Sequence, residues 1–143
     1  MAKLLRAVRL DDSDDHIFRA GGAAKDGEPV VTGGFAGCHS SFLAIGSRAR
    51  CSIAEVHEVT QEELEARIEA FAWQLVRGWN APSWEAAREL AEEEIRHTAE
   101  VCETLAPEVW ITVKRTQSAD GTGIDEQYSV YDRLMIGAHE VGR

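Results

Sequence analysis

The most regular hydrophobic pattern in this chain begins at residue 60 and has the spacing of an amphipathic helix. Thr60 and Glu63 stand where a capping box needs them, with each side chain able to satisfy the other residue's backbone amide. The apolar residues that follow recur three or four positions apart, which places them on one helical face: Leu64, Ile68, Phe71 and Leu75. This pattern predicts a helix over residues 60–79.

A second helical pattern follows after a short break at residues 78–82. Ser83 is a favourable N-cap residue, and Pro107 lies just beyond the expected end of the helix. Such a short break favours two antiparallel helices. We therefore expect a helical hairpin with helices at 60–79 and 83–105.

Alternation of apolar and polar residues predicts strands in the rest of the chain. The expected strands are residues 3–10, a short strand at Val30 and Val31, a hairpin over 41–59 that turns at Gly46–Ser47, and a second hairpin formed by 108–117 and 124–133. In the first hairpin the apolar phase shifts after Ile53, which predicts a β-bulge. The whole pattern predicts an α+β fold, an antiparallel sheet of about five strands with both helices on one face.

Composition adds limits to this picture. The 143 residues are 44% hydrophobic and 28% charged, as expected for one domain over 1–143, with 134–143 as a loose tail. The net charge of −10 argues against nucleic acid and against an anionic membrane as partners.

The chain also shows no secretory h-region near its start and no apolar stretch of ~20 residues that could span a bilayer. Three cysteines are too few for a disulfide framework. We therefore expect a cytoplasmic protein with reduced thiols.

Glu94 is the most unusual residue of the second helix, because the helical pattern places it on the apolar face. A carboxylate there needs a partner or a raised pKa. His97 lies one turn further along, so the two could form part of a metal site or an acid–base pair. The alternative is structural, an ion pair that locks the helix to the sheet through an arginine: Arg6, Arg48 or Arg50.

Cys38, His39 and His57 supply further side chains that ligate metals or act as nucleophiles. The cysteines lack the C-x-x-C spacing of a zinc site, so we expect no metal. The glycine-rich segments match neither the dinucleotide fingerprint nor the P-loop, and we expect no cofactor. Cys38, beside His39, is the most plausible single reactive thiol.

Trp79 and Trp84 flank the expected tip of the helical hairpin. Tryptophan most often packs in a core, but it is also enriched among binding hot spots. The tip is therefore a candidate surface for a protein partner.

Three blocks of the sequence resemble a bacterial family catalogued only as a domain of unknown function. They are KLLRAVRLDDSDDHIF, FLAIGSRARCSIAEV and AEEEIRHTAEVCETLAPEVWITVKR, and between Cys38 and Phe42 the chain is shorter than the family pattern. The resemblance implies a bacterial, cytoplasmic protein and brings no activity, cofactor or catalytic residue with it.

Two functional hypotheses follow. The favoured one is a non-catalytic accessory or interaction protein that binds a protein partner or a second copy of itself. The rival is a small-molecule- or metal-binding enzyme whose site lies between helix and sheet, and no catalytic residue can be assigned for it. Its candidate residues are Glu94, His97, Cys102, Cys38, His39 and His57.

Overall fold

The two predicted helices are present with nearly the predicted bounds. The computed structural model describes residues 2–8, 24–32 and 40–132. In it, α1 covers Gln61–Gly78 and α2 covers Trp84–Cys102. The capping box is formed, because Thr60 Oγ1 accepts the Glu63 amide at 3.1 Å and Glu63 Oε1 accepts the Thr60 amide at 2.8 Å. The Ser83 hydroxyl oxygen caps α2 by accepting the Ala86 amide at 3.1 Å.

The sheet is antiparallel throughout, and the chain is α+β as predicted, but the expectation of about five strands is wrong. The described residues form seven strands in the order β4-β3-β2-β1-β5-β6-β7. β2 and β3 lie where short strands were expected, and the count is higher in part because the second arm of the predicted 41–59 hairpin is divided into β4 and β5. The strands are β1 (Ala2–Val8), β2 (Pro29–Val31), β3 (Phe42–Ala44), β4 (Arg50–Cys51), β5 (Ile53–Val59), β6 (Trp110–Gln117) and β7 (Ile124–Tyr131).

The predicted hairpin over 41–59 is formed only in its first part. Phe42 pairs with Cys51 across the turn, as expected. After Ser52, however, the chain leaves β3, and β5 pairs with β1 along its whole length. The phase shift that predicted a bulge near Ile53 therefore marks the point where the strand changes its partner.

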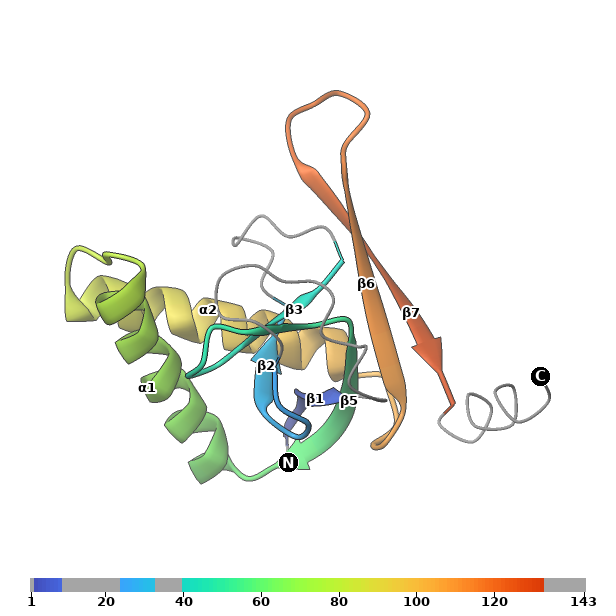
Figure 1. Ribbon diagram of the computed structural model, residues 1–143, viewed down its shortest axis with the longest axis horizontal. Helices are drawn as coiled ribbons and strands as arrows, with labels where there is room; N and C mark the ends of the chain where they lie inside the picture. The colour runs from blue at the N-terminus through green and yellow to red at the C-terminus, as the bar shows by residue number, and fades with distance from the viewer. Residues whose placement is uncertain (1, 9–23, 33–39, 133–143) are drawn as a thin grey trace.

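The prediction that both helices pack on one face of the sheet is wrong in its detail. The sheet is curled into a half-barrel, and α2 lies against β1 and β2. α1 runs at an angle to α2, packs mainly on it, and reaches the sheet chiefly at β5 (Figure 1). A curled sheet offers less flat surface than two helices side by side would need. Only α2 therefore lies along the sheet, and α1 packs on α2.

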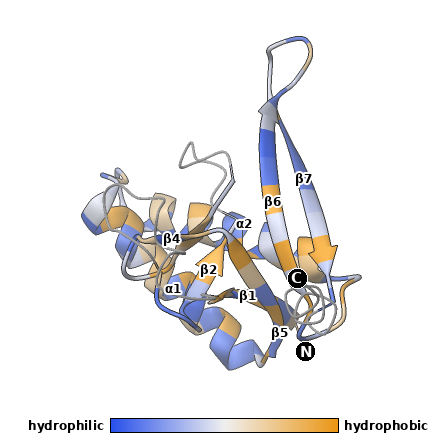
Figure 2. Ribbon diagram, turned by 45° about the vertical axis from the view of Figure 1, so that its right-hand side comes forward, coloured by the Kyte–Doolittle hydropathy of each residue, from blue (hydrophilic) through white to orange (hydrophobic). Residues whose placement is uncertain are grey.

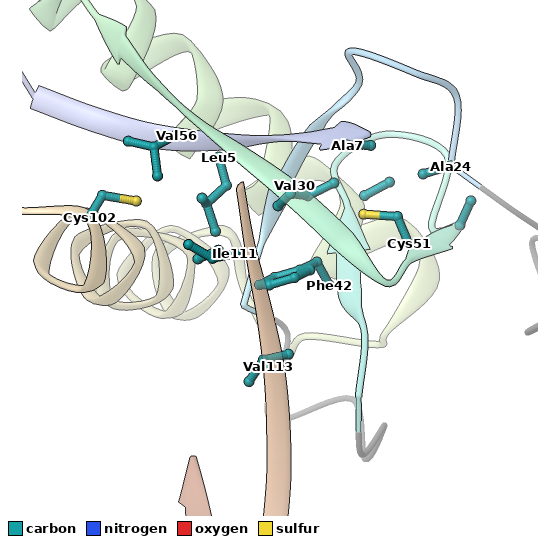
Figure 3. Close-up of a cluster of buried hydrophobic side chains, with 13 residues drawn as sticks. Leu5, Ala7, Ala24, Val30, Phe42, Cys51, Val56, Cys102, Ile111 and Val113 are labelled. Carbon is teal, nitrogen blue, oxygen red and sulfur yellow. The ribbon is translucent and has the colours of Figure 1, made fainter. Parts of the chain in front are cut away.

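Two groups of buried side chains hold these parts together. One fills the inside of the curled sheet, where Phe42 lies beside Ile111 and Val30, with Cys102 of α2 at one side and Cys51 at the other (Figure 3). The second group lies between the sheet and the helices. Its largest fully buried members are Leu4, Val31, Leu43, Val59, Phe71, Leu75 and Ile95.

The β6–β7 hairpin extends beyond the rest of the described fold (Figure 1). Its outer part is mostly hydrophilic, while apolar residues gather near its base (Figure 2). All eight residues of β7 pair with β6, from Ile124 opposite Gln117 to Tyr131 opposite Trp110. Neither α1 nor α2 has the length and apolar character needed to cross a membrane.

Candidate functional site

Glu94 is half-buried on α2, and two threonines donate hydrogen bonds to it. The Thr32 hydroxyl donates to Glu94 Oε1, and the Thr98 hydroxyl donates to the Glu94 carbonyl oxygen at 3.0 Å. Two of the arginines proposed as its partner make other contacts. Arg6 pairs with Glu55 at 2.6 Å, and Arg48 donates to the Gly78 carbonyl at 3.3 Å.

His97 contacts a residue that the sequence did not bring to attention. Its Nε2 lies 3.1 Å from Glu126 Oε1 on β7, and its side chain is 45% exposed. The structure therefore places His97 against the β6–β7 hairpin, at the position where Glu126 pairs with Arg115.

Arg115 on β6 is the centre of this arrangement and is only 3% exposed. Its Nε donates to Glu126 Oε2 at 2.9 Å, and its Nη1 donates to the Ser41 carbonyl at 3.0 Å. Its Nη2 donates to the Thr32 carbonyl. We call this set the Arg115 network: Thr32, Glu94, His97, Arg115, Glu126 and Tyr128.

Sequence reasoning missed Arg115, although a signal was present. Residues 111, 113 and 115 alternate on one face of β6, and the first two are the buried Ile111 and Val113. Period-two alternation therefore places the arginine on the buried face as well.

Glu126 accepts hydrogen bonds within this network and stays ionised. Burial by itself would raise the pKa of Glu126, but the hydrogen bonds from Arg115, Tyr128 and His97 outweigh burial and lower it. Burial, together with the charge of Glu126, raises the pKa of Tyr128, so that phenol stays protonated and donates at 2.9 Å. The network thus works as a clamp that fixes the hairpin to α2 and to the ends of β2 and β3.

Of the other predicted site residues, the two that the structure describes, Cys102 and His57, lie on different elements with different partners. Cys102 is fully buried in the curled sheet, and burial raises its pKa to about 12, so the thiol stays protonated near neutral pH. His57 lies on β5 and contacts α1. Cys38 and His39 lie outside the described residues. Among the residues that are described, no group of three or more His, Cys, Asp and Glu side chains is placed to hold a metal ion.

His57 is held as a neutral imidazole by Arg67. Arg67 Nη2 lies 3.0 Å from His57 Nε2, and since a guanidinium can only donate, Nε2 must accept. Burial, followed by the positive charges of Arg67 and Arg6, lowers the pKa of His57 from 6.5 to about 4.

Stability should therefore depend on pH through His57. Between pH 6.5 and about 4, the unfolded chain binds a proton at this residue that the folded chain does not bind. The free energy of unfolding should thus be highest above pH 6.5 and fall as the pH is lowered, and His57→Gln should remove part of that fall. Urea unfolding of both proteins at about pH 7 and about pH 5 measures the difference. An identical fall in the two proteins would contradict a neutral, buried His57.

An aromatic surface lies where α1 meets the start of α2. Trp73 is 42% exposed, and its ring centroid lies 4.5 Å from that of Trp84. The Arg77 guanidinium lies 5.0 Å from the Trp73 ring centroid, at cation–π distance. We call these three residues the Trp73 surface. Trp79 has a different position, because it packs against the buried group between sheet and helices.

Helix geometry explains the Trp73 surface. Trp73 and Arg77 are four residues apart on α1, so they are neighbours on one face. The chain turns back within a few residues and Ser83 starts the second helix, which brings Trp84 beside Trp73. Next to them is a pocket of about 200 Å³. It is lined by Gly46, Arg48, Ala70, Trp73, Gln74, Arg77 and Gly78.

Residues 1–137 match the family of unknown function DUF6505, and the chain belongs to that family. The match confirms the resemblance to a domain of unknown function. No curated protein and no solved structure matches this chain.

Proposed function

We propose that this protein is an interaction module that binds a segment of a partner protein at the Trp73 surface. The observation that carries the proposal is the position of Trp73, a large aromatic side chain that is 42% exposed beside an arginine. Tryptophan and arginine are the residue types most enriched among binding hot spots. The predicted interaction residue Trp84 forms part of the same surface.

The side chains of the Trp73 surface also contact one another in the absence of a partner. Trp73 packs on both Trp84 and Arg77, which limits the rotamers available to all three side chains. A partner would therefore lose little side-chain entropy in ordering them, and that cost often decides the affinity of an interface.

The size of the adjoining pocket favours a protein partner over a free small molecule. It holds about 200 Å³, below the ~300–1,000 Å³ of typical small-molecule sites. A pocket of this size suits one side chain of a docked segment, with the rest of the segment lying across Trp73.

Selection of random displayed peptides on the immobilised full-length protein tests the proposal. Peptides enriched on the wild type should lose at least about thirtyfold in affinity for Trp73→Ala, because truncating a hot spot removes about 2 kcal/mol or more. Biolayer interferometry with the purified peptides gives the dissociation constants.

Tyr131→Ala is the matched control. Tyr131 is an aromatic residue with nearly the same exposure, 41%, but it lies on β7. Binding to this variant should equal binding to the wild type. Peptides that lose affinity for Tyr131→Ala and keep it for Trp73→Ala would move the interaction surface to the edge of the sheet and overturn the proposal.

A further inference from the structure

The pocket beside Trp73 is basic, although the chain as a whole is strongly acidic. The net charge is −10, yet the described residues that line this pocket include Arg48 and Arg77 and no acid. Two arginines therefore concentrate positive charge at one small pocket of an acidic protein.

The turn that carries Arg48 is held against α1 by hydrogen bonds. Arg48 lies in the turn between β3 and β4 with a φ of 62°, a left-handed conformation that is uncommon for residues other than glycine. Gln74 on α1 holds this turn, since its Oε1 accepts the Gly46 amide and its Nε2 donates to the Ala44 carbonyl at 3.3 Å. The turn is thus tied to α1 at the pocket.

Because Gly78 has no side chain, the Arg48 side chain can occupy the space beside it. A Cβ at this position would overlap Arg48 Nη1, which donates to the Gly78 carbonyl at 3.3 Å. The end of α1 therefore needs a residue without a side chain for Arg48 to stay beside Trp73 and Arg77.

We infer that the partner segment presents an aspartate or glutamate carboxylate to Arg48 and Arg77 while a neighbouring apolar side chain packs on Trp73. This inference rests on the proposed function and names the chemistry of the partner. Arg48 uses one of its five donors on the Gly78 carbonyl, and the contact of Arg77 with the Trp73 ring uses no N–H donor, so the two guanidinium groups can donate to both oxygens of a carboxylate. A phosphate has three acceptor oxygens and about twice the charge, and the phosphoserine peptide in the test below distinguishes the two anions.

The test uses three acetylated and amidated peptides, Glu-Phe-Glu, Gln-Phe-Gln and phosphoserine-Phe-phosphoserine, added to the full-length ¹⁵N-labelled protein. The Trp73 indole N–H signal, assigned with Trp73→Phe, reports binding. Glu-Phe-Glu should shift this signal in a saturable way, and Gln-Phe-Gln should bind about tenfold more weakly, because a charge-assisted contact is lost.

Three variants should each weaken Glu-Phe-Glu binding by about tenfold: Arg48→Gln, Arg77→Gln and Gly78→Ala. The last keeps every charge and displaces only the Arg48 side chain. Arg96→Gln is the control, since it removes one positive charge from an exposed residue of α2 that pairs with Glu92. Its binding should match the wild type.

The outcomes separate the two proposals. Equal binding of the Glu and Gln peptides, or no shift with Glu-Phe-Glu, would overturn the carboxylate while leaving the Trp73→Ala result to decide the interaction surface. Tighter binding of the phosphoserine peptide than of Glu-Phe-Glu would show that the pocket prefers a phosphate and would overturn the carboxylate as the ligand. Weakening by Arg96→Gln equal to that of Arg77→Gln would show a general charge effect and overturn the assignment to this pocket.

Discussion

Arg115→Met should lower the free energy of unfolding by about 3–5 kcal/mol, because it removes one partner of a buried ion pair. The substitution leaves the half-buried Glu126 without its strongest donor. It also leaves the Ser41 and Thr32 carbonyls without the guanidinium that they accept. Methionine keeps much of the side-chain volume, so lost packing contributes little.

Urea unfolding followed by circular dichroism gives the free energies, with Lys114→Met as the control. Lys114 is the neighbouring residue on β6 and is exposed, so its loss should change stability by no more than about 0.5 kcal/mol. If both variants were within about 1 kcal/mol of the wild type, the Arg115 network would not be the clamp described above.

Phe42→Ala should destabilise the protein by about 3–5 kcal/mol through the cavity it leaves in the curled sheet. Phe42 is 0% exposed and lies beside Ile111 and Val30 (Figure 3). Its neighbours belong to strands that pair along their backbones, so the sheet can collapse only partly around the missing ring.

Ile124→Ala provides the comparison for this substitution. Ile124 is also a large apolar residue of the sheet, but it is 60% exposed, so its truncation should cost about 0.5 kcal/mol or less. The same urea titrations measure both variants. A loss below about 1.5 kcal/mol for Phe42→Ala would mean that the inside of the half-barrel is loosely packed.

The elements defined by local signals were predicted well. The Thr60 capping box and the Ser83 cap set the starts of both helices, and the alternating residues of β6 and β7 set the second hairpin. Their physical basis lies within a few residues of chain, in side chains that satisfy nearby amides or share one face. The short strands β2, β3 and β4 have no comparable local basis, because each is stabilised mainly by its neighbours in the sheet.

The candidate site was predicted only in part, for the same reason. The helical pattern brought Glu94 and His97 to attention, but the partner of His97 is Glu126, 29 residues further along the chain. Arg115 binds carbonyls of Ser41 and Thr32, which are 74 and 83 residues away from it in sequence. Pairings over such separations depend on how the sheet curls, and no spacing in the sequence encodes that curl.

The sequence by itself determined the α+β class, the two capped helices and the hairpin at the end of the sheet, because hydrogen bonds and apolar periodicity act over short stretches of chain. The tertiary structure decided which tryptophan is exposed, since the packing of α1 on α2 turns Trp79 inward and leaves Trp73 42% exposed. It also decided that Arg48 reaches Gly78 and shares a pocket with Arg77. These contacts arise where separate elements meet, and their geometry follows from the packing of the whole sheet and both helices.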